Sequence, residues 1–314
     1  MYDVIVIGGG PAGLAAAIYL ARQKMKFMML TGDIGGQTIW SSDIENYLGF
    51  HLIDGVKLVG EFRKHLDDYR DAFELHEGEQ VTKVEAIGDG SVSQRAAGFR
   101  VTTGKGTYET KTVLIATGEK HRELNVTGEK ELYGRGVTYC ATCDAPLFGG
   151  KDVVVVGGGN SAMDAALFLE KYASHVTLMT VNKELSGDAV MKGKCESSPK
   201  ISVITNAKTV RILGTEQGKV SGIEYQLADG SAQTKATEGV FIEIGLVPVS
   251  GFIDIVQKDR WGQIVVDKYN ATSVPGIWAA GDVTDVTEKQ IAVAAGEGSK
   301  AALGIIKWLQ SQPR

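Results

Sequence analysis

The residues best suited to chemistry in this sequence are two cysteines, Cys140 and Cys143, in the segment VTYCATCDAPLF. The chain has only one other cysteine, Cys195, and it begins with a strand-like segment in place of a secretion signal. We therefore expect a cytoplasmic protein, whose reducing surroundings disfavour a structural disulfide framework. A Cys-x-x-Cys pair in such a protein is typical of a redox-active or a metal-binding centre.

The composition argues against several classes of partner. The 33 basic and 38 acidic residues give a net charge of −5, and no cluster of Lys or Arg predicts binding to nucleic acid or to an anionic membrane surface. No apolar run approaches the length of a transmembrane helix, so no membrane partner is expected. With 314 residues, 43% of them hydrophobic, the chain can form two domains, and its 40 glycines predict many tight turns.

A glycine-rich turn lies close to the start of the chain, between the strand-like YDVIVIGGG and an alanine-rich helical pattern. Gly8 permits a tight turn, Gly10 lets the backbone approach a pyrophosphate, and Gly13 allows the helix to pack closely. A second strand is expected at 27–30. It ends at Thr31, where an Asp or Glu for the adenosine ribose would be usual. We therefore predict a dinucleotide site in which Thr31 or a backbone group replaces that carboxylate.

The same pattern recurs in KDVVVVGGGNSAMDAALFLEKYASHVTLMTV, with Gly157, Gly159 and Ala162 at the turn. Two such units in one chain suggest a flavin domain and a nicotinamide domain, because hydride chemistry needs a donor site that faces an acceptor site. The strand VTLM leads into TVNKELSG, which has no acid at the strand end and no arginine for a 2′-phosphate. The second unit could therefore also be a scaffold that binds no nucleotide.

These features, taken together, resemble the low-molecular-weight, two-cysteine thioredoxin reductases and the related flavoprotein subunit of alkyl hydroperoxide reductase. The resemblance covers essentially the whole chain. The segments that carry it are GGGPAGLAAAIYLAR, GGQ at 35–37, IENYLGF at 44–50, IATG at 115–118, YCATCD, GGGNSAMDAA, AAGDVTD at 279–285 and KQIAVAAGEG at 289–298.

The resemblance implies an α/β fold of two Rossmann-like, three-layer ββα dinucleotide-binding domains, the second inserted into the first. An FAD-binding domain would comprise residues 1–117 and 246–314, and an NAD(P)-like domain at 118–245 would carry the redox disulfide. The connections would lie near Gly118 and Gly245, the latter within FIEIGLVP, which looks like a crossover strand. A homodimer is implied as well.

The resemblance also implies roles for individual residues. Cys143 would lie against the isoalloxazine ring, Cys140 would attack the substrate disulfide, and Asp144 would donate or accept the proton. The motif fits a helix start, where the helix dipole lowers a thiol pKa. Asp282 would contact the ribityl chain of FAD. The other predicted cofactor contacts are Gln290, Ile291 and Ala292 beside the ring, and Gly8, Gly10, Pro11, Ala12, Gly13, Thr31, Gly36, Gln37, Asn46, Val81, Ala116, Thr117, Gly118 and Gly281.

A zinc site is the competing interpretation of the cysteine pair, and it needs about four ligands. Cys195 lies far beyond Cys143 in the sequence, and no histidine lies near the motif. We therefore predict no metal, and we interpret Cys195 as a bystander thiol. The five histidines are expected to be structural or solvent-facing: His51, His65, His76, His121 and His175.

The electron donor is the least determined part of the prediction. Relatives that use NADPH carry an arginine cluster after the second-domain strand, where this chain has Val181, Asn182 and Ser186. The hydroperoxide reductase flavoprotein, which prefers NADH, has a glutamate at the position of Thr180. Binding of a nicotinamide nucleotide is therefore doubtful.

The leading interpretation is an FAD-dependent reductase that passes electrons to thioredoxin or a thioredoxin-like protein. Its electrons would come from ferredoxin or another low-potential donor. The alternatives are an NADH- or NADPH-dependent thioredoxin reductase, a flavin dithiol oxidase that passes electrons to oxygen, and a non-catalytic flavin redox sensor.

Overall fold

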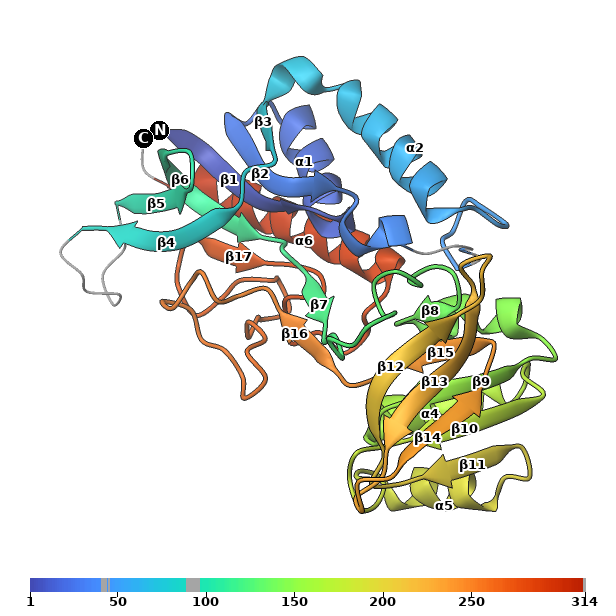
Figure 1. Ribbon diagram of the computed structural model, residues 1–314. Helices are drawn as coiled ribbons and strands as arrows, with labels where there is room; N and C mark the ends of the chain where they lie inside the picture. Colours follow the sequence, from blue (N-terminus) through green and yellow to red (C-terminus); the bar gives the residue numbers. More distant parts are fainter. Residues whose placement is uncertain (41–43, 45, 89–96, 313–314) are drawn as a thin grey trace. The chain divides into compact units, whose positions relative to one another are not determined.

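The computed structural model describes residues 1–40, 44, 46–88 and 97–312, and the chain divides into two compact units (Figure 1). Unit 1 comprises Met1–Lys120 and Val247–Arg314, and unit 2 comprises His121–Leu246. One compact unit is thus inserted into the sequence of the other. The expected connections near Gly118 and Gly245 lie close to these limits, and the cofactor assigned to each unit stays a prediction.

The described part of unit 1 contains a seven-stranded sheet of order β3–β2–β1–β6–β5–β4, in which β17 also pairs with β6. Strands β1, β2, β3, β6 and β17 are parallel neighbours, whereas β4 and β5 are antiparallel. The elements of unit 1 are β1 (Tyr2–Gly9), α1 (Pro11–Arg22), β2 (Phe27–Ile34), η1 (Gly36–Trp40), α2 (Gly55–Asp67), η2 (Arg70–Ala72), β3 (Glu74–Glu77), β4 (Val81–Ile87), β5 (Gly98–Thr103), β6 (Thr107–Ile115), β17 (Ile277–Ala279) and α6 (Ile291–Gln310).

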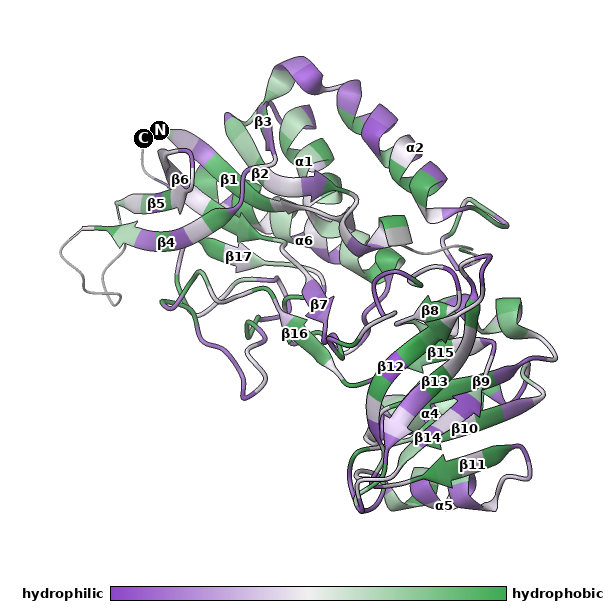
Figure 2. Cartoon of the chain, in the orientation of Figure 1, coloured by the Kyte–Doolittle hydropathy of each residue, from purple (hydrophilic) through white to green (hydrophobic). Residues whose placement is uncertain are grey.

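The central strand β1 is buried on both faces, which explains its continuous apolar run. Val4 and Val6 pack into a core with the helices, and Ile5 and Ile7 pack into a second core on the opposite face. Helices α1 and α6 lie beside each other in the first core, although they come from opposite ends of the sequence (Figure 1). Helix α2 is amphipathic, with alternating hydrophobic and hydrophilic stretches (Figure 2).

Unit 2 contains a parallel sheet of order β11–β10–β9–β15–β8 and an antiparallel sheet of order β12–β13–β14. Val153 and Val155 of β9 pack with α4, and Val154 and Val156 pack towards the antiparallel sheet. The elements of unit 2 are β8 (Val137–Thr138), α3 (Ala141–Asp144), η3 (Ala145–Phe148), β9 (Asp152–Val156), α4 (Asn160–Leu169), β10 (His175–Met179), α5 (Ala189–Ser197), β11 (Ile201–Ile204), β12 (Lys208–Gly214), β13 (Val220–Gln226), β14 (Ala232–Ala236) and β15 (Gly239–Ile242). This is the predicted order of layers: sheet, sheet and helices.

The segment FIEIGLVP is not one crossover strand, contrary to the sequence-based expectation. It is divided between the end of β15 and β16 (Leu246–Pro248), and Gly245 between them has a φ of +104°. This left-handed conformation interrupts an extended chain, and glycine adopts it without a Cβ clash. Strand β16 pairs with β7 (Glu119–His121), so the two connections between the units are hydrogen-bonded to each other. Among the described residues, no helix has the length and apolar character needed to span a bilayer.

Candidate functional site

The cysteine pair forms a disulfide within unit 2. The Cα atoms of Cys140 and Cys143 are 5.3 Å apart, and Cys140 is the N-cap residue of α3. The backbone N–H of Cys143 donates to Cys140 Sγ at 3.2 Å. After reduction, this amide would stabilise a thiolate on Cys140, which suits the predicted attacking cysteine.

Asp144 is held in place by Thr138, a residue that the sequence analysis missed. The Thr138 hydroxyl donates to Asp144 Oδ2, and the backbone N–H of Cys140 donates to the same hydroxyl at 3.2 Å. Thr138 is buried at the end of β8, two positions before the first cysteine. One hydroxyl therefore links the predicted proton-transfer group to the backbone of the predicted nucleophile.

An aromatic cluster flanks this motif within unit 2. His121 stacks on Tyr139 with ring centroids 4.9 Å apart, and Tyr133 meets the edge of Tyr139 at 5.3 Å. Burial lowers the pKa of His121 to about 4, so its ring is neutral at physiological pH. The pKa of Tyr133 is raised to about 12, first by burial and then by the charge of Asp144. His121 is thus part of a neutral aromatic cluster, in agreement with its structural interpretation.

Glu243, directly after β15, is a further titratable group near the start of α3. Burial raises its pKa to about 7, a bond from the backbone amide of Ala141 opposes this shift, and the charge of Asp164 adds to it. No local sequence signal distinguishes this glutamate, because its burial depends on how β15 and α3 pack.

The first glycine turn, in unit 1, has the shape that a pyrophosphate requires. Gly8 has a φ of +113°, and a Cβ there would lie 2.2 Å from the carbonyl oxygen of Ala116. A Cβ on Gly13 would lie 2.0 Å from the carbonyl oxygen of Gly8, whereas a Cβ on Gly10 would meet nothing within 4 Å. Gly10 caps α1 without a side-chain hydrogen bond, and Pro11 follows it. The residues present therefore fit a dinucleotide phosphate at the start of α1.

The strand that follows is longer than expected. Strand β2 does not end before Thr31 but continues to Ile34, because an irregularity in β1 lets Gly9 pair with Ile34. Thr31 is buried, and its hydroxyl donates to the carbonyl oxygen of Asp33 at 2.5 Å. The hydroxyl can still accept a hydrogen bond, which is compatible with the predicted ribose contact.

The other predicted FAD contacts all lie in unit 1, and the structure brings several of them together. Asn46 Nδ2 donates to Gln290 Oε1 at 3.0 Å, across more than two hundred residues of sequence. A Cβ on Gly36 would lie 3.4 Å from Gly10, and one on Gly281 would lie 3.0 Å from Ala12. Of the segment IENYLGF, residue 45 lies outside the described residues. The remaining positions are Gln37 in η1, Val81 at the start of β4, Ala116, Thr117 and Gly118 after β6, and Ile291 and Ala292 at the start of α6.

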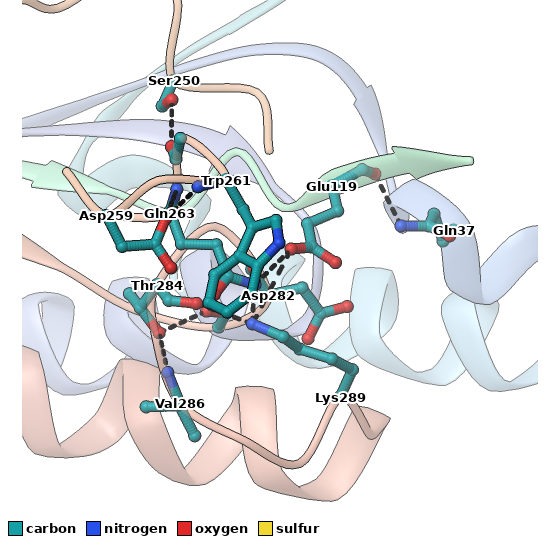
Figure 3. Close-up of polar contacts among 12 residues, drawn as sticks. Gln37, Glu119, Ser250, Asp259, Trp261, Gln263, Asp282, Thr284, Val286 and Lys289 are labelled. Atoms are coloured by element: carbon teal, nitrogen blue, oxygen red, sulfur yellow. Dashed lines mark hydrogen bonds and ion pairs between the residues drawn. The ribbon is translucent and has the colours of Figure 1, made fainter. Parts of the chain in front are cut away.

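A charged cluster surrounds Asp282 (Figure 3). The pKa of Asp282 is raised to about 6 by burial, a shift that Lys289 opposes and Glu119 increases. Lys289 Nζ donates to the carbonyl oxygens of Asp282 at 2.9 Å and Thr284 at 2.6 Å. The same ammonium group lies 3.8 Å from Glu119 Oε1. Glu119 and Lys289 were not among the predicted site residues, although Glu119 directly follows one of the segments that carry the resemblance and Lys289 begins another.

The second glycine turn, in unit 2, lacks groups specific for a 2′-phosphate. Gly157 has a φ of +153°, and Gly159 caps α4 without a side-chain bond. Both the backbone N–H and the hydroxyl of Ser186 donate to the carbonyl oxygen of Gly158, at 2.7 and 3.3 Å. Thr180 is buried, Val181 is 64% exposed, and residues 180–188 include no arginine. Among the described residues, no group of three or more His, Cys, Asp or Glu side chains could hold a metal ion.

The chain belongs to the pyridine nucleotide-disulphide oxidoreductase family, because the model of that family matches residues 2–298. This class of enzyme agrees with the two Rossmann-like units and the Cys140–Cys143 disulfide. The predicted fold class and the predicted resemblance are both confirmed.

Two curated relatives show how far the similarity extends. The chain is 42% identical over 305 residues to the alkyl hydroperoxide reductase flavoprotein (the F component) of Pseudomonas putida, a match that covers 96% of this chain and 57% of that protein. It is 38% identical over 312 residues to a protein of Bacillus subtilis named NADH dehydrogenase, a match that covers 98% of this chain and 58% of that protein. The chain thus spans less than two thirds of the length of these relatives.

Two solved structures match nearly the full length of the chain. Thioredoxin reductase from Streptococcus pyogenes has a TM-score of 0.89 at 36% identity, over 99% of both chains. A ferredoxin-flavin thioredoxin reductase from Clostridium acetobutylicum has a TM-score of 0.53 at 30% identity, again over 99% of both chains.

Proposed function

We propose that this chain is an FAD-dependent, thioredoxin reductase-like disulfide oxidoreductase. Flavin electrons would reduce the Cys140–Cys143 disulfide, and the resulting dithiol would reduce a disulfide of thioredoxin or a thioredoxin-like protein. The observation that carries the proposal is the disulfide at the start of α3, beside an aspartate that Thr138 orients. Similarity to a thioredoxin reductase over the full chain supports it. A cytoplasmic homodimer is proposed from the family resemblance.

The residues of unit 1 would bind and orient the cofactor. The free amides at the start of α1 suit its pyrophosphate, and Asp282 suits a hydroxyl of its ribityl chain. When bound, FAD supplies a two-electron carrier that accepts electrons from a donor and passes them to a disulfide.

The residues of unit 2 would carry out thiol–disulfide exchange. Two electrons and a proton convert the Cys140–Cys143 disulfide into a thiolate and a thiol. The Cys140 thiolate then attacks the partner disulfide, which forms a mixed disulfide and releases one partner thiolate. Cys143, once deprotonated, attacks Cys140 Sγ, which restores the internal disulfide and releases the second partner thiolate. Asp144 would move the proton between Cys143 and the leaving thiolates.

For the electron donor, we propose a low-potential protein such as ferredoxin. Residues 180–188 contain no arginine that could bind a 2′-phosphate, and Thr180 offers a hydroxyl where a carboxylate would bind the ribose of NADH. The similarity to a ferredoxin-flavin thioredoxin reductase also favours this donor. NADH or NADPH is the second candidate, supported by the family and by the relative named NADH dehydrogenase.

Anaerobic reduction of the purified protein distinguishes these donors. NADH, NADPH and photoreduced ferredoxin are added separately, and the loss of flavin absorbance is followed. We expect rapid bleaching with ferredoxin alone, followed by reduction of a thioredoxin disulfide. Purified protein that binds no FAD, or that reduces no protein disulfide with any donor, would contradict the proposal. Oxygen consumption driven by a dithiol would instead identify a dithiol oxidase.

A further inference from the structure

Glu119 carries a buried carboxylate oxygen for which the cluster around Asp282 provides no donor. The residue is 4% exposed and directly follows the segment IATG. Gln263 Nε2 donates to Glu119 Oε1 at 2.9 Å, and Lys289 Nζ lies 3.8 Å from the same oxygen. Glu119 Oε2 is buried and has no hydrogen-bond partner among the described residues. Such an oxygen destabilises a protein unless a donor reaches it, so it calls for a specific partner.

The orientation of Glu119 relates this oxygen to the predicted cofactor site. Figure 3 shows one carboxylate oxygen joined to Gln263 and Lys289, while the other points away from both. The Asp282 carboxylate is near enough for Glu119 to raise its pKa. Gln37, a predicted FAD contact, donates through Nε2 to the backbone carbonyl of Glu119 at 2.6 Å. Three residues at distant sequence positions thus hold Glu119 against residues expected to contact FAD.

We infer that Glu119 Oε2 accepts a hydrogen bond from a hydroxyl of the ribityl chain of FAD, beside Asp282. This inference rests on the proposed FAD-dependent function. An ionised carboxylate can only accept hydrogen bonds, so its partner must carry an O–H or N–H group. The ribityl chain is a row of hydroxyls, and Asp282 is the residue predicted to contact it. Lys289 is itself fixed by two carbonyl oxygens and supplies a compensating positive charge.

The test is the dissociation constant of FAD for the full chain after removal and re-addition of the cofactor. Glu119→Gln keeps the size of the side chain and an acceptor for Gln263, but it places an NH₂ group at the unpartnered position. We expect FAD to bind about tenfold to a hundredfold more weakly, as is typical for the loss of a hydrogen bond to a charged group. Glu119→Ala should weaken binding at least as much.

Glu297→Gln is the matched control, because it changes a largely buried carboxylate of the same unit. Both Glu297 oxygens are already bonded, to Asn270 Nδ2 and to Lys300 Nζ. This variant should lower the melting temperature without changing the affinity for FAD. If Glu119→Gln also changed only the melting temperature, Glu119 would have a purely structural role and the inference would be overturned.

FAD analogues that lack one ribityl hydroxyl test the same bond from the cofactor side, without relying on the stability of any variant. One analogue should bind wild-type protein about tenfold to a hundredfold more weakly than FAD, yet bind Glu119→Gln as well as FAD does. Independent, additive losses for every analogue would overturn the inference. Failure of the wild-type chain to bind FAD would instead refute the proposed function.

Discussion

Introducing arginine at positions 181 and 182 should create a response to NADPH if the second glycine turn can bind a dinucleotide. Val181 is 64% exposed and Asn182 is also exposed, so both substitutions should leave the core of unit 2 intact. Ser186 is left unchanged, because its backbone and hydroxyl both bond to Gly158. The perturbation therefore adds positive charge beside the turn without removing a contact that shapes it.

The expected gain follows from the chemistry of the 2′-phosphate. A charge-assisted hydrogen bond contributes about 1.5–3 kcal/mol, which corresponds to roughly one to two decades of affinity. Two arginines that both reach the phosphate should therefore tighten NADPH binding by about two to four decades. NADH lacks the phosphate and should gain nothing. The neutral pair Val181→Gln and Asn182→Gln provides a control of similar side-chain length.

The assay is anaerobic stopped-flow measurement of flavin bleaching at increasing concentrations of NADPH and NADH. We expect little bleaching of the wild type and the glutamine control, and saturable bleaching of the arginine variant by NADPH alone. Fast bleaching of the wild type at micromolar NADPH or NADH would refute the reasoning, because it would show that no phosphate clamp is needed. An arginine variant that binds NADPH tightly, yet shows no bleaching, would exclude this turn as a hydride-donor site.

Four further changes test the cysteine motif and the buried titratable groups. Cys140→Ser should abolish reduction of a disulfide acceptor but keep a thiolate-to-flavin absorbance band, which Cys143→Ser should lose; a band that follows Cys140 would reverse their roles. Thr138→Val should slow turnover about fivefold or more, since a hydrogen bond of about 1 kcal/mol is lost, whereas Thr138→Ser should restore it; equal rates would argue against positioning by this hydroxyl. Burial raises the pKa of Asp282 from 3.8 to about 6, so its contribution to stability is most favourable below pH 3.8 and is lost as pH rises through 6; Asp282→Asn should therefore stabilise FAD-free protein at pH 8 relative to pH 4 by about 3 kcal/mol in chemical denaturation, and a pH-independent difference would contradict the shift. Cys195 is fully buried and burial raises its pKa to about 11, so it should react with a thiol reagent only after unfolding, and fast labelling of the native protein would show that it is accessible.

The features that could be predicted from the sequence are those whose physical cause is local. Gly8 and Gly13 indicate a strand–turn–helix unit, because each must bring its own backbone close to a neighbouring segment. The spacing of Cys140 and Cys143 is sufficient for a disulfide across one helical turn. These signals lie within short stretches of chain, and they identified both the fold class and the redox centre.

The features that were missed depend on partners far away in the sequence. Strand β2 extends beyond Thr31 because Gly9 of a neighbouring strand pairs with Ile34, a contact that β2 alone cannot indicate. Likewise, nothing around Glu119 shows that Gln263 and Lys289 will lie against its carboxylate. A glutamate considered alone is expected to be a solvated surface residue, and only the folded chain shows that this one is buried.

The pairing of β7 with β16 has a consequence for how such proteins can diverge. Because the two strands are hydrogen-bonded neighbours, the chain enters and leaves unit 2 at points separated by about one inter-strand spacing, roughly 5 Å. An insert whose ends lie this close together can be exchanged between genes through two nearby junctions, without opening the sheet of the host. Recombination at Glu119–His121 and Leu246–Pro248 could thus replace the disulfide-bearing unit as a cassette, so that the two halves of an electron-transfer chain can have separate ancestries.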